Sequence, residues 1–265
     1  MITLTASQKQ QFVEEGYLVV RGLLAPEQVE ETKSRLLGSM GIAENDPATW
    51  EGKPSFPTDL NVIGTTSAAR TPEFEAVTEQ LVGPDFRRGV CFSPFLEWND
   101  LPSELAGYIP VLAYPAPGEK QLTPSGYHID GGKYVTTYPV RYFLAVMAYL
   151  TDVSEYGGAT LVRPGSHRQV FEQWLADGRV PEEPFAAVPP LDYADPVAVV
   201  AEAGDVCFMH YLMVHSGSAN RAATIRVGIN TAVQPDPACS YRPKVGPPQS
   251  DWTPMDHTLR TDKQP

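Results

Sequence analysis

The segment Asp205-Val-Cys-Phe-Met-His-Tyr-Leu-Met-Val-His215 is a nearly continuous apolar run that starts at a Gly-Asp turn and ends at a histidine. A run of this length predicts a buried β-strand over 205–214. On such a strand His215 shares a face with four other residues, Cys207, Met209, Tyr211 and Met213. His210 falls on the opposite face. We therefore expect His215 to point into a site at the strand end and His210 to be a buried structural histidine.

Similar short runs recur through the chain. Apart from 17–20, they lie beyond about residue 86, at 88–92, 109–114, 126–129, 141–151, 159–162, 197–202 and 226–233. Short strands at this spacing, with 26 Pro and 21 Gly for turns, favour a sandwich or barrel over alternating strands and helices.

Helix signals concentrate near the N-terminus. Capping-box patterns at Thr5 to Gln8 and at Ser166 to Gln169 predict two helix starts, and further helices are expected over 26–37 and 72–82. With no linker in sight, we predict one mainly β domain with flanking helices over 1–265. It consists of a helical part to about 85, a β core over about 86–235 and a tail over 236–265.

Charge and composition exclude several function classes. Asp and Glu total 32 and Lys and Arg total 20, a net charge of -12, which argues against nucleic-acid partners and anionic membrane surfaces. No stretch reaches the roughly 18 apolar residues of a membrane span, and the first residues lack a signal-peptide pattern. Three scattered cysteines give no disulfide framework. We expect a cytoplasmic protein that acts on a small molecule.

Tyr127-His-Ile-Asp130 contains a candidate metal-binding pair. Residues two apart on a strand face the same side, so His128 and Asp130 can bind one metal ion. Chance alone gives roughly 0.6 His-x-Asp/Glu matches in a chain of this composition. A strand-end histidine followed by a turn aspartate explains the motif equally well.

Arg226 begins the strand pattern 226–233, ten residues or so after His215. Val227 and Ile229 share one face of that strand, which leaves Arg226 on the other. An arginine that points into a barrel needs an anionic partner because an unpaired buried charge is costly. The alternative is a surface salt bridge on an edge strand.

Two imidazoles and a carboxylate on one side of a metal form the facial arrangement of non-haem Fe(II) oxygenases. Three positions then stay open for a co-substrate and O2. An arginine behind the metal suits a dicarboxylate such as 2-oxoglutarate, through a bidentate pair with its distal end. A structural zinc site would want four protein ligands, often thiolates, and the cysteine spacing does not supply them.

The chain resembles the phytanoyl-CoA dioxygenase family of Fe(II)/2-oxoglutarate oxygenases. The likeness covers most of the chain and rests on segments in the family's order. They are the opening helix and strand over 4–24, the His-x-Asp motif at 128–130, the Gly-Gly to Pro-Gly-Ser-His segment at 157–167, and the closing His, Asn and Arg segment at 215–226.

The resemblance implies a double-stranded β-helix, a jelly-roll of the cupin type, with helices packed outside. It implies His128, Asp130 and His215 as iron ligands and catalytic residues, and Arg226 as the partner of the distal carboxylate of 2-oxoglutarate. Fe(II), 2-oxoglutarate and O2 are the implied cofactors, and His167 is not a ligand. Halogenating relatives replace the ligand carboxylate by a small residue, so Asp130 favours hydroxylation.

Two further contacts to the co-substrate are expected by the same resemblance. Tyr134 stands where some relatives have an aromatic residue, although ordinary packing explains it equally well. Some relatives have a serine two residues after the second histidine, where this chain has Gly217 between Ser216 and Ser218. We take Ser218 as the candidate hydroxyl.

The sequence supports hydroxylation of a small molecule at an unactivated C–H bond, with release of succinate and CO2. One alternative is a cupin-like metal enzyme that does not use 2-oxoglutarate, in which Arg226 has no obvious role. The other is a binding protein without turnover. The substrate, the position oxidised and the oligomeric state are not encoded in any pattern of the sequence.

Overall fold

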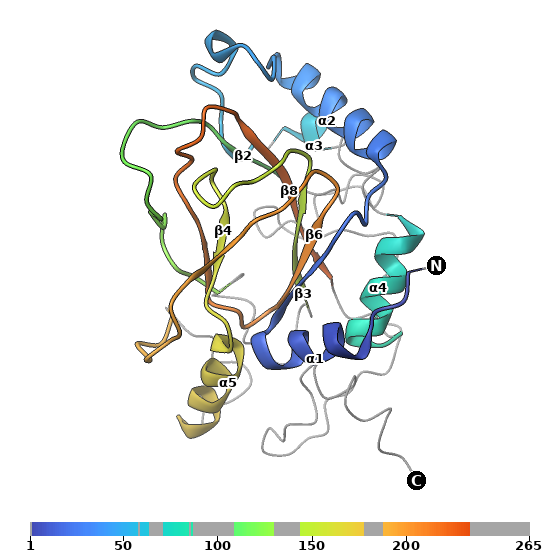
Figure 1. Ribbon diagram of the computed structural model, residues 1–265, viewed down its shortest axis with the longest axis vertical. Coiled ribbons are helices and arrows are strands. Elements are labelled where there is room, and N and C mark those ends of the chain that lie inside the picture. Colours follow the sequence, from blue (N-terminus) through green and yellow to red (C-terminus); the bar gives the residue numbers. More distant parts are fainter. Residues whose placement is uncertain are drawn as a thin grey trace.

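The computed structural model describes residues 2–57, 59–63, 71–84, 86, 109–129, 144–177 and 188–233 (Figure 1). The elements in chain order are α1 (Ala6–Glu15), β1 (Tyr17–Val20), α2 (Pro26–Met40), the 3-10 helix η1 (Pro47–Thr49), α3 (Leu60–Ile63), α4 (Pro72–Val82), β2 (Ile109–Ala113), β3 (Leu144–Tyr149), β4 (Thr160–Val162), α5 (Ser166–Ala176), β5 (Val197–Val199), β6 (Val206–His210), β7 (His215–Gly217) and β8 (Arg226–Val233). The run predicted at 88–92 and the tail at 236–265 lie outside the described residues.

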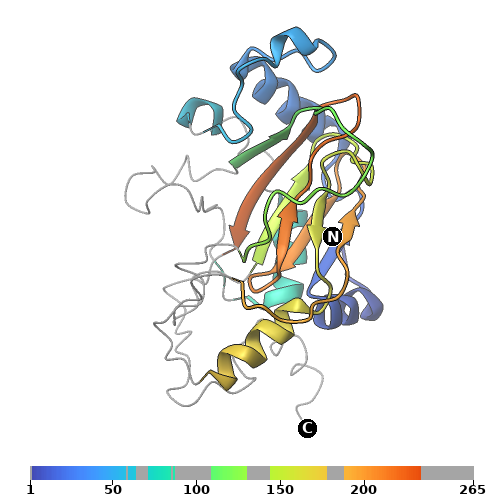
Figure 2. The same ribbon diagram turned by 90° about the vertical axis from the view of Figure 1, so that its left-hand side faces the viewer.

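Two antiparallel sheets form the centre of the protein. The larger has the strand order β1-β6-β3-β8-β2, and the smaller has the order β5-β4-β7. Strand β8 therefore lies between β3 and β2 and is not at an edge. Strand β1 pairs with β6, so the mostly helical N-terminal part also supplies one edge of the larger sheet. The β-rich architecture with helices outside confirms the predicted fold class (Figure 2).

Apolar side chains form two cores on opposite faces of the larger sheet. The inner core lies between the sheets and consists of Val111, Ala145, Met147, Tyr149, Val153, Ala159, Val162, Val199, Ala201, Cys207, Met209 and Met213. The outer core joins the other face to α1, α2 and α4. Phe74 of α4 packs on Phe208 of β6, with ring centroids 5.4 Å apart. The outer core therefore packs the larger sheet against the helices, and the inner core packs it against the smaller sheet.

The strand predicted over 205–214 is shorter than expected. Strand β6 ends at His210, and Met213 donates its backbone N–H to the His210 carbonyl in a turn. The chain then enters the smaller sheet at His215. Tyr211 was predicted on the His215 face but lies in the outer core. Because every residue of the run is buried, its hydrophobic pattern does not reveal the turn at which the chain passes from the larger sheet to the smaller one.

The helices begin close to the predicted positions. Thr5 and Gln8 form the expected capping box of α1, and α4 covers the predicted 72–82. The predicted second capping box is wrong, because Ser166 is the first residue of α5 and its hydroxyl bonds elsewhere. No helix within the described ranges is long and apolar enough to cross a bilayer.

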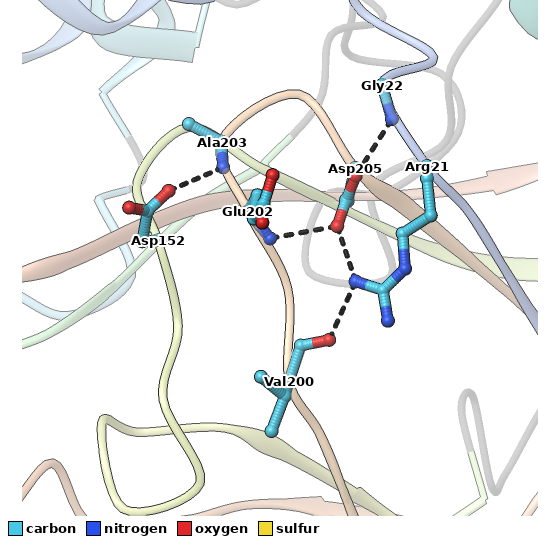
Figure 3. A network of polar contacts seen from close by, with 7 residues as sticks. All are labelled: Arg21, Gly22, Asp152, Val200, Glu202, Ala203 and Asp205. Atoms are coloured by element: carbon cyan, nitrogen blue, oxygen red, sulfur yellow. Dashed lines mark hydrogen bonds and ion pairs between the residues drawn. The ribbon is translucent and has the colours of Figure 1, made fainter.

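A buried carboxylate ties β1 to the turn before β6 (Figure 3). Asp205 accepts hydrogen bonds from Arg21 Nη1 at 2.6 Å and from the backbone N–H groups of Gly22 and Glu202, each at 2.8 Å. The Asp205 side chain is only 3% exposed, whereas that of Arg21 is 62% exposed. Charge-assisted bonds of this kind are the strong ones, so the network stabilises the edge of the larger sheet.

Candidate active site

His128 and His215 lie opposite each other on adjacent strands. Each donates its backbone N–H to the other's carbonyl, at 2.9 and 3.0 Å, in an antiparallel bridge. Directly opposite residues project to the same side of a sheet, and the two imidazole centroids are 4.4 Å apart. The structure thus brings together two of the three predicted metal ligands, from positions 87 residues apart in sequence.

The two imidazoles are held in the same way. Nδ1 of His128 lies 3.0 Å from the Gly126 carbonyl, and Nδ1 of His215 lies 2.9 Å from the Met213 carbonyl. A carbonyl only accepts, so Nδ1 bears a hydrogen in each ring, and the neutral form of such a ring has its lone pair on Nε2. Metal-binding histidines are oriented by hydrogen bonds of this kind, so the pair has the tautomer that a metal ion requires.

The Pro-Gly-Ser-His turn holds the segment that leads into His215. The Ser166 hydroxyl accepts the Val214 N–H at 2.9 Å, and Gly165, in the left-handed region at φ +76°, donates its N–H to the Glu15 carbonyl. Both Ser166 and Val214 are fully buried. This turn therefore connects the end of α1 to the strand that positions the second histidine.

His167 and His210 form a second imidazole pair, with a structural role. Their ring centroids are 5.1 Å apart, and both side chains are 1% exposed. His210 Nδ1 accepts the Leu212 N–H, and His167 Nε2 lies 3.2 Å from the Val13 carbonyl. Burial lowers the pKa of His167 to about 4 and that of His210 well below its usual value. The predicted structural role of His210 is confirmed.

Arg226 lies on the inner face of the larger sheet. It is 6% exposed, and its Nη1 lies 4.0 Å from the Met147 sulfur. Met147 belongs to the inner core together with Val162, the residue paired with His215. Arg226 and His215 therefore face the same region between the two sheets, one from each sheet, whereas His128 is exposed.

The Arg226 guanidinium has no carboxylate partner among the residues that the structure describes. Its buried Nε also lacks a hydrogen bond. Burial lowers the pKa of this group, yet arginine keeps its charge in proteins. A buried cation without a counter-ion lowers the stability of the folded protein, and a bound anionic ligand would offset that cost. The surface salt bridge weighed above is therefore wrong, since β8 is an inner strand.

Three predicted site residues, Asp130, Tyr134 and Ser218, are not placed beside the histidine pair and Arg226 by the described structure. Asp130 and Tyr134 lie outside the described residues, and within them no group of three potential ligands gathers. Ser218 accepts the Thr123 N–H at 3.2 Å. By strand alternation its side chain points to the face opposite His215. Sequence reasoning also did not find the buried hydrogen bond from the Tyr149 hydroxyl to Thr160 Oγ1, which joins the two sheets.

Solved structures show the same fold at low sequence identity. The non-haem α-ketoglutarate-dependent epimerase SnoN from nogalamycin biosynthesis matches with a TM-score of 0.60 at 20% identity, covering 86% of this chain and 82% of that chain. The carbocyclase SnoK of the same biosynthesis gives 0.54 at 19%, covering 88% and 85%. EvdO2 from Micromonospora carbonacea var. aurantiaca gives 0.58 at 13%, covering 88% and 92%.

Comparison with curated protein sequences gave no match. The comparison with protein families gave a match over residues 12–228, to phytanoyl-CoA dioxygenase (PhyH). That range contains both histidines of the pair and Arg226, and it spans both sheets except for the last five residues of β8. With most of its length matched, the chain belongs to the phytanoyl-CoA dioxygenase family of oxidoreductases, which depend on iron and 2-oxoglutarate.

Proposed function

We propose that this protein hydroxylates an unactivated C–H bond of a small molecule, with O2 as oxidant and succinate and CO2 as co-products. The observation that supports this most strongly is the buried guanidinium of Arg226, which has no carboxylate partner among the described residues and lies on the sheet face that His215 also faces. A dicarboxylate bound at the metal brings the missing anion. A cupin-like enzyme without 2-oxoglutarate leaves this buried charge without an obvious role, and the titration below tests for a binding protein without turnover.

We assign the roles of the residues as follows. His128 and His215 hold the metal through Nε2, and Asp130 is proposed as the third ligand. Arg226 binds the distal carboxylate of 2-oxoglutarate, and Tyr134 is proposed to line the co-substrate. When bound, iron and 2-oxoglutarate supply the oxidising power that removes hydrogen from carbon. The inner core contributes an apolar surrounding that limits the access of water.

The type of oxidation needs its own test, because similar folds support different outcomes. SnoK is a carbocyclase and SnoN an epimerase, and SnoN was crystallised with Fe3+, α-ketoglutarate and nogalamycin RO. We propose hydroxylation because the sequence retains Asp130, the ligand that halogenating relatives lack. A product heavier by one oxygen supports this, whereas an isomer or a product lighter by two hydrogens favours epimerisation or ring closure.

The first experiment is an anaerobic titration of the metal-free protein with Fe(II) and then 2-oxoglutarate. A weak visible charge-transfer band that needs both components, and that is lost in His215→Ala, supports the proposed site. Metal binding without a band favours the cupin-like alternative. A protein that binds no metal favours the binding protein without turnover.

A further inference from the structure

The segment that leads into His128 contains one residue more than the strand it pairs with. His128 and His215 exchange both of their backbone hydrogen bonds, and Ser125 donates its backbone N–H to the Gly217 carbonyl at 2.9 Å. Between these two pairings, two residues of the first segment lie opposite a single residue of the second. This arrangement is a β-bulge, a feature that is common beside active sites because it redirects a side chain.

Gly126 is the first residue of the bulge. Its φ angle is +143°, a conformation that residues with a Cβ atom rarely adopt. In an uninterrupted antiparallel ladder, Gly126 would exchange both backbone hydrogen bonds with Gly217. The bulge removes it from the ladder, so its N–H donates to Ser216 Oγ at 3.1 Å and its carbonyl lies 3.0 Å from Nδ1 of His128. The carbonyl that orients His128 is therefore available only because of the bulge.

The Nδ1 hydrogen bond matters more for His128 than for His215. His215 is 5% exposed, so its neighbours restrain the ring, whereas His128 is exposed. An exposed ring loses rotamer freedom when a metal fixes it, unless a hydrogen bond has already restricted it. A metal ligand has to present Nε2 in a fixed direction. The direction of the His128 ring therefore depends on where the Gly126 carbonyl points.

The Ser216 hydroxyl keeps Gly126 in the bulge. Ser216 is fully buried, and by strand alternation its side chain lies on the face opposite His215. Its hydroxyl donates to the Gly217 carbonyl at 2.8 Å, which leaves the oxygen lone pairs for the Gly126 N–H. Loss of this hydroxyl removes the partner that holds the N–H outside the ladder, and the residue is then free to turn its carbonyl away from His128.

We propose that Gly126 and Ser216 are positioning residues that hold the His128 imidazole in the direction and tautomer that metal binding requires. Ser216 acts through Gly126, and Gly126 acts through His128. The inference rests on the proposed function and deepens it, because it names two residues that set metal affinity without contact with the metal.

The test is a titration of the metal-free protein with Co(II), which takes the same nitrogen and oxygen ligands as Fe(II). Ser216→Ala is expected to weaken Co(II) binding about 10- to 100-fold, the range for residues that orient metal ligands. The second readout needs no metal. Long-range 1H–15N spectra at about pH 8, where imidazole is neutral, should show the His128 hydrogen on Nδ1 in the wild type and a mixture of tautomers in Ser216→Ala. The His215 signals should not change.

Gly126→Ala tests the bulge without removal of a polar group. A Cβ atom at position 126 meets no heavy atom within 4 Å, so its effect arises from the backbone conformation alone. Co(II) affinity should fall by a similar factor. Gly52→Ala is the control, because Gly52 has φ +70° and an equally unobstructed Cβ position, in the turn after η1. That variant should lower Tm and leave the Kd for Co(II) unchanged.

Ser218→Ala is the matched control for Ser216→Ala. Ser218 lies two residues further along on the same face, and its hydroxyl accepts the Thr123 N–H at 3.2 Å, but the Thr123 carbonyl accepts the Ala219 N–H and holds no imidazole. Its Co(II) affinity and His128 tautomer should match the wild type. Equal losses in both serine variants would indicate general loosening of the sheet and overturn the inference. An unchanged Kd and an unchanged tautomer in Ser216→Ala would also overturn it, although the proposed function would stand. A wild-type protein that binds no Co(II) removes both.

Discussion

Replacing Arg226 by methionine should change stability and ligand binding in opposite directions. In the ligand-free protein the guanidinium has no described counter-ion, and its buried Nε lacks a partner. An unsatisfied buried polar group costs about 1–3 kcal/mol, and a charged one costs more. Methionine has a similar length and can pack on Met147. We therefore expect metal-free Arg226→Met to be about 1–3 kcal/mol more stable to unfolding, with Tm higher by about 2–4 °C per kcal/mol.

Binding of 2-oxoglutarate should suffer in the same variant. Loss of one partner from a buried charge pair costs about 2–5 kcal/mol, which is roughly a 30- to 4,000-fold increase in Kd. Urea unfolding of the metal-free protein gives the first quantity, and the anaerobic titration gives the second. Arg221→Met is the control, because Arg221 Nη1 donates to the carbonyls of Ala116 and Pro117. That variant should lose stability and keep 2-oxoglutarate binding. If Arg226→Met is less stable and binds 2-oxoglutarate normally, Arg226 is a structural residue and the reasoning fails.

Three further predictions concern the metal, the edge of the sheet and pH. Asp130→Ala should abolish iron-dependent turnover with an unchanged circular dichroism spectrum, and retained turnover would remove Asp130 from the ligand set. Asp205→Ala should lower the free energy of unfolding by about 2–4 kcal/mol, because it removes a buried carboxylate that accepts hydrogen bonds from one guanidinium and two backbone N–H groups. Arg21→Ala, at an exposed side chain, should cost under about 1 kcal/mol, and equal losses in urea titrations would contradict the network. For His167, the folded-state pKa of about 4 lies below the unfolded value of about 6.5, so its stability contribution is complete above pH 6.5. About 3 kcal/mol is lost as the pH falls towards 4, and urea unfolding of His167→Gln should show a shallower dependence across that window.

The sequence predicted best where polar and apolar residues alternate. In 226–233 the apolar Val227 and Ile229 alternate with Arg226 and Gly228, and β8 has the predicted bounds and the predicted inward-facing arginine. The run 205–215 lacks such alternation, since the sheet on one side and the helices on the other bury all its residues. Its pattern therefore gave no sign of the turn between β6 and β7.

Tertiary contacts explain what local patterns could not provide. The Ser166 to Gln169 pattern is that of a capping box, yet the Ser166 hydroxyl is occupied by the Val214 N–H, 48 residues away. The Tyr149–Thr160 bond connects different sheets, and although Thr160 lies in the segment 157–167, nothing in that segment points to Tyr149 as its partner. Ser218 was chosen because it flanks Gly217, the position at which some relatives have a serine, but residues three apart on a strand point to opposite faces.

The cost of Arg226 is itself an argument for a ligand. A hydrophobic residue would fill the space above Gly228 at a lower free energy, because apolar replacements of buried charges are commonly neutral or stabilising. Stability alone therefore does not explain a cation at this position. The two imidazoles, by contrast, satisfy their Nδ1 hydrogens through backbone carbonyls and impose no comparable penalty. Since no carboxylate among the described residues offsets the cost of this guanidinium, we expect the complex with 2-oxoglutarate and metal to have a higher Tm than the ligand-free protein.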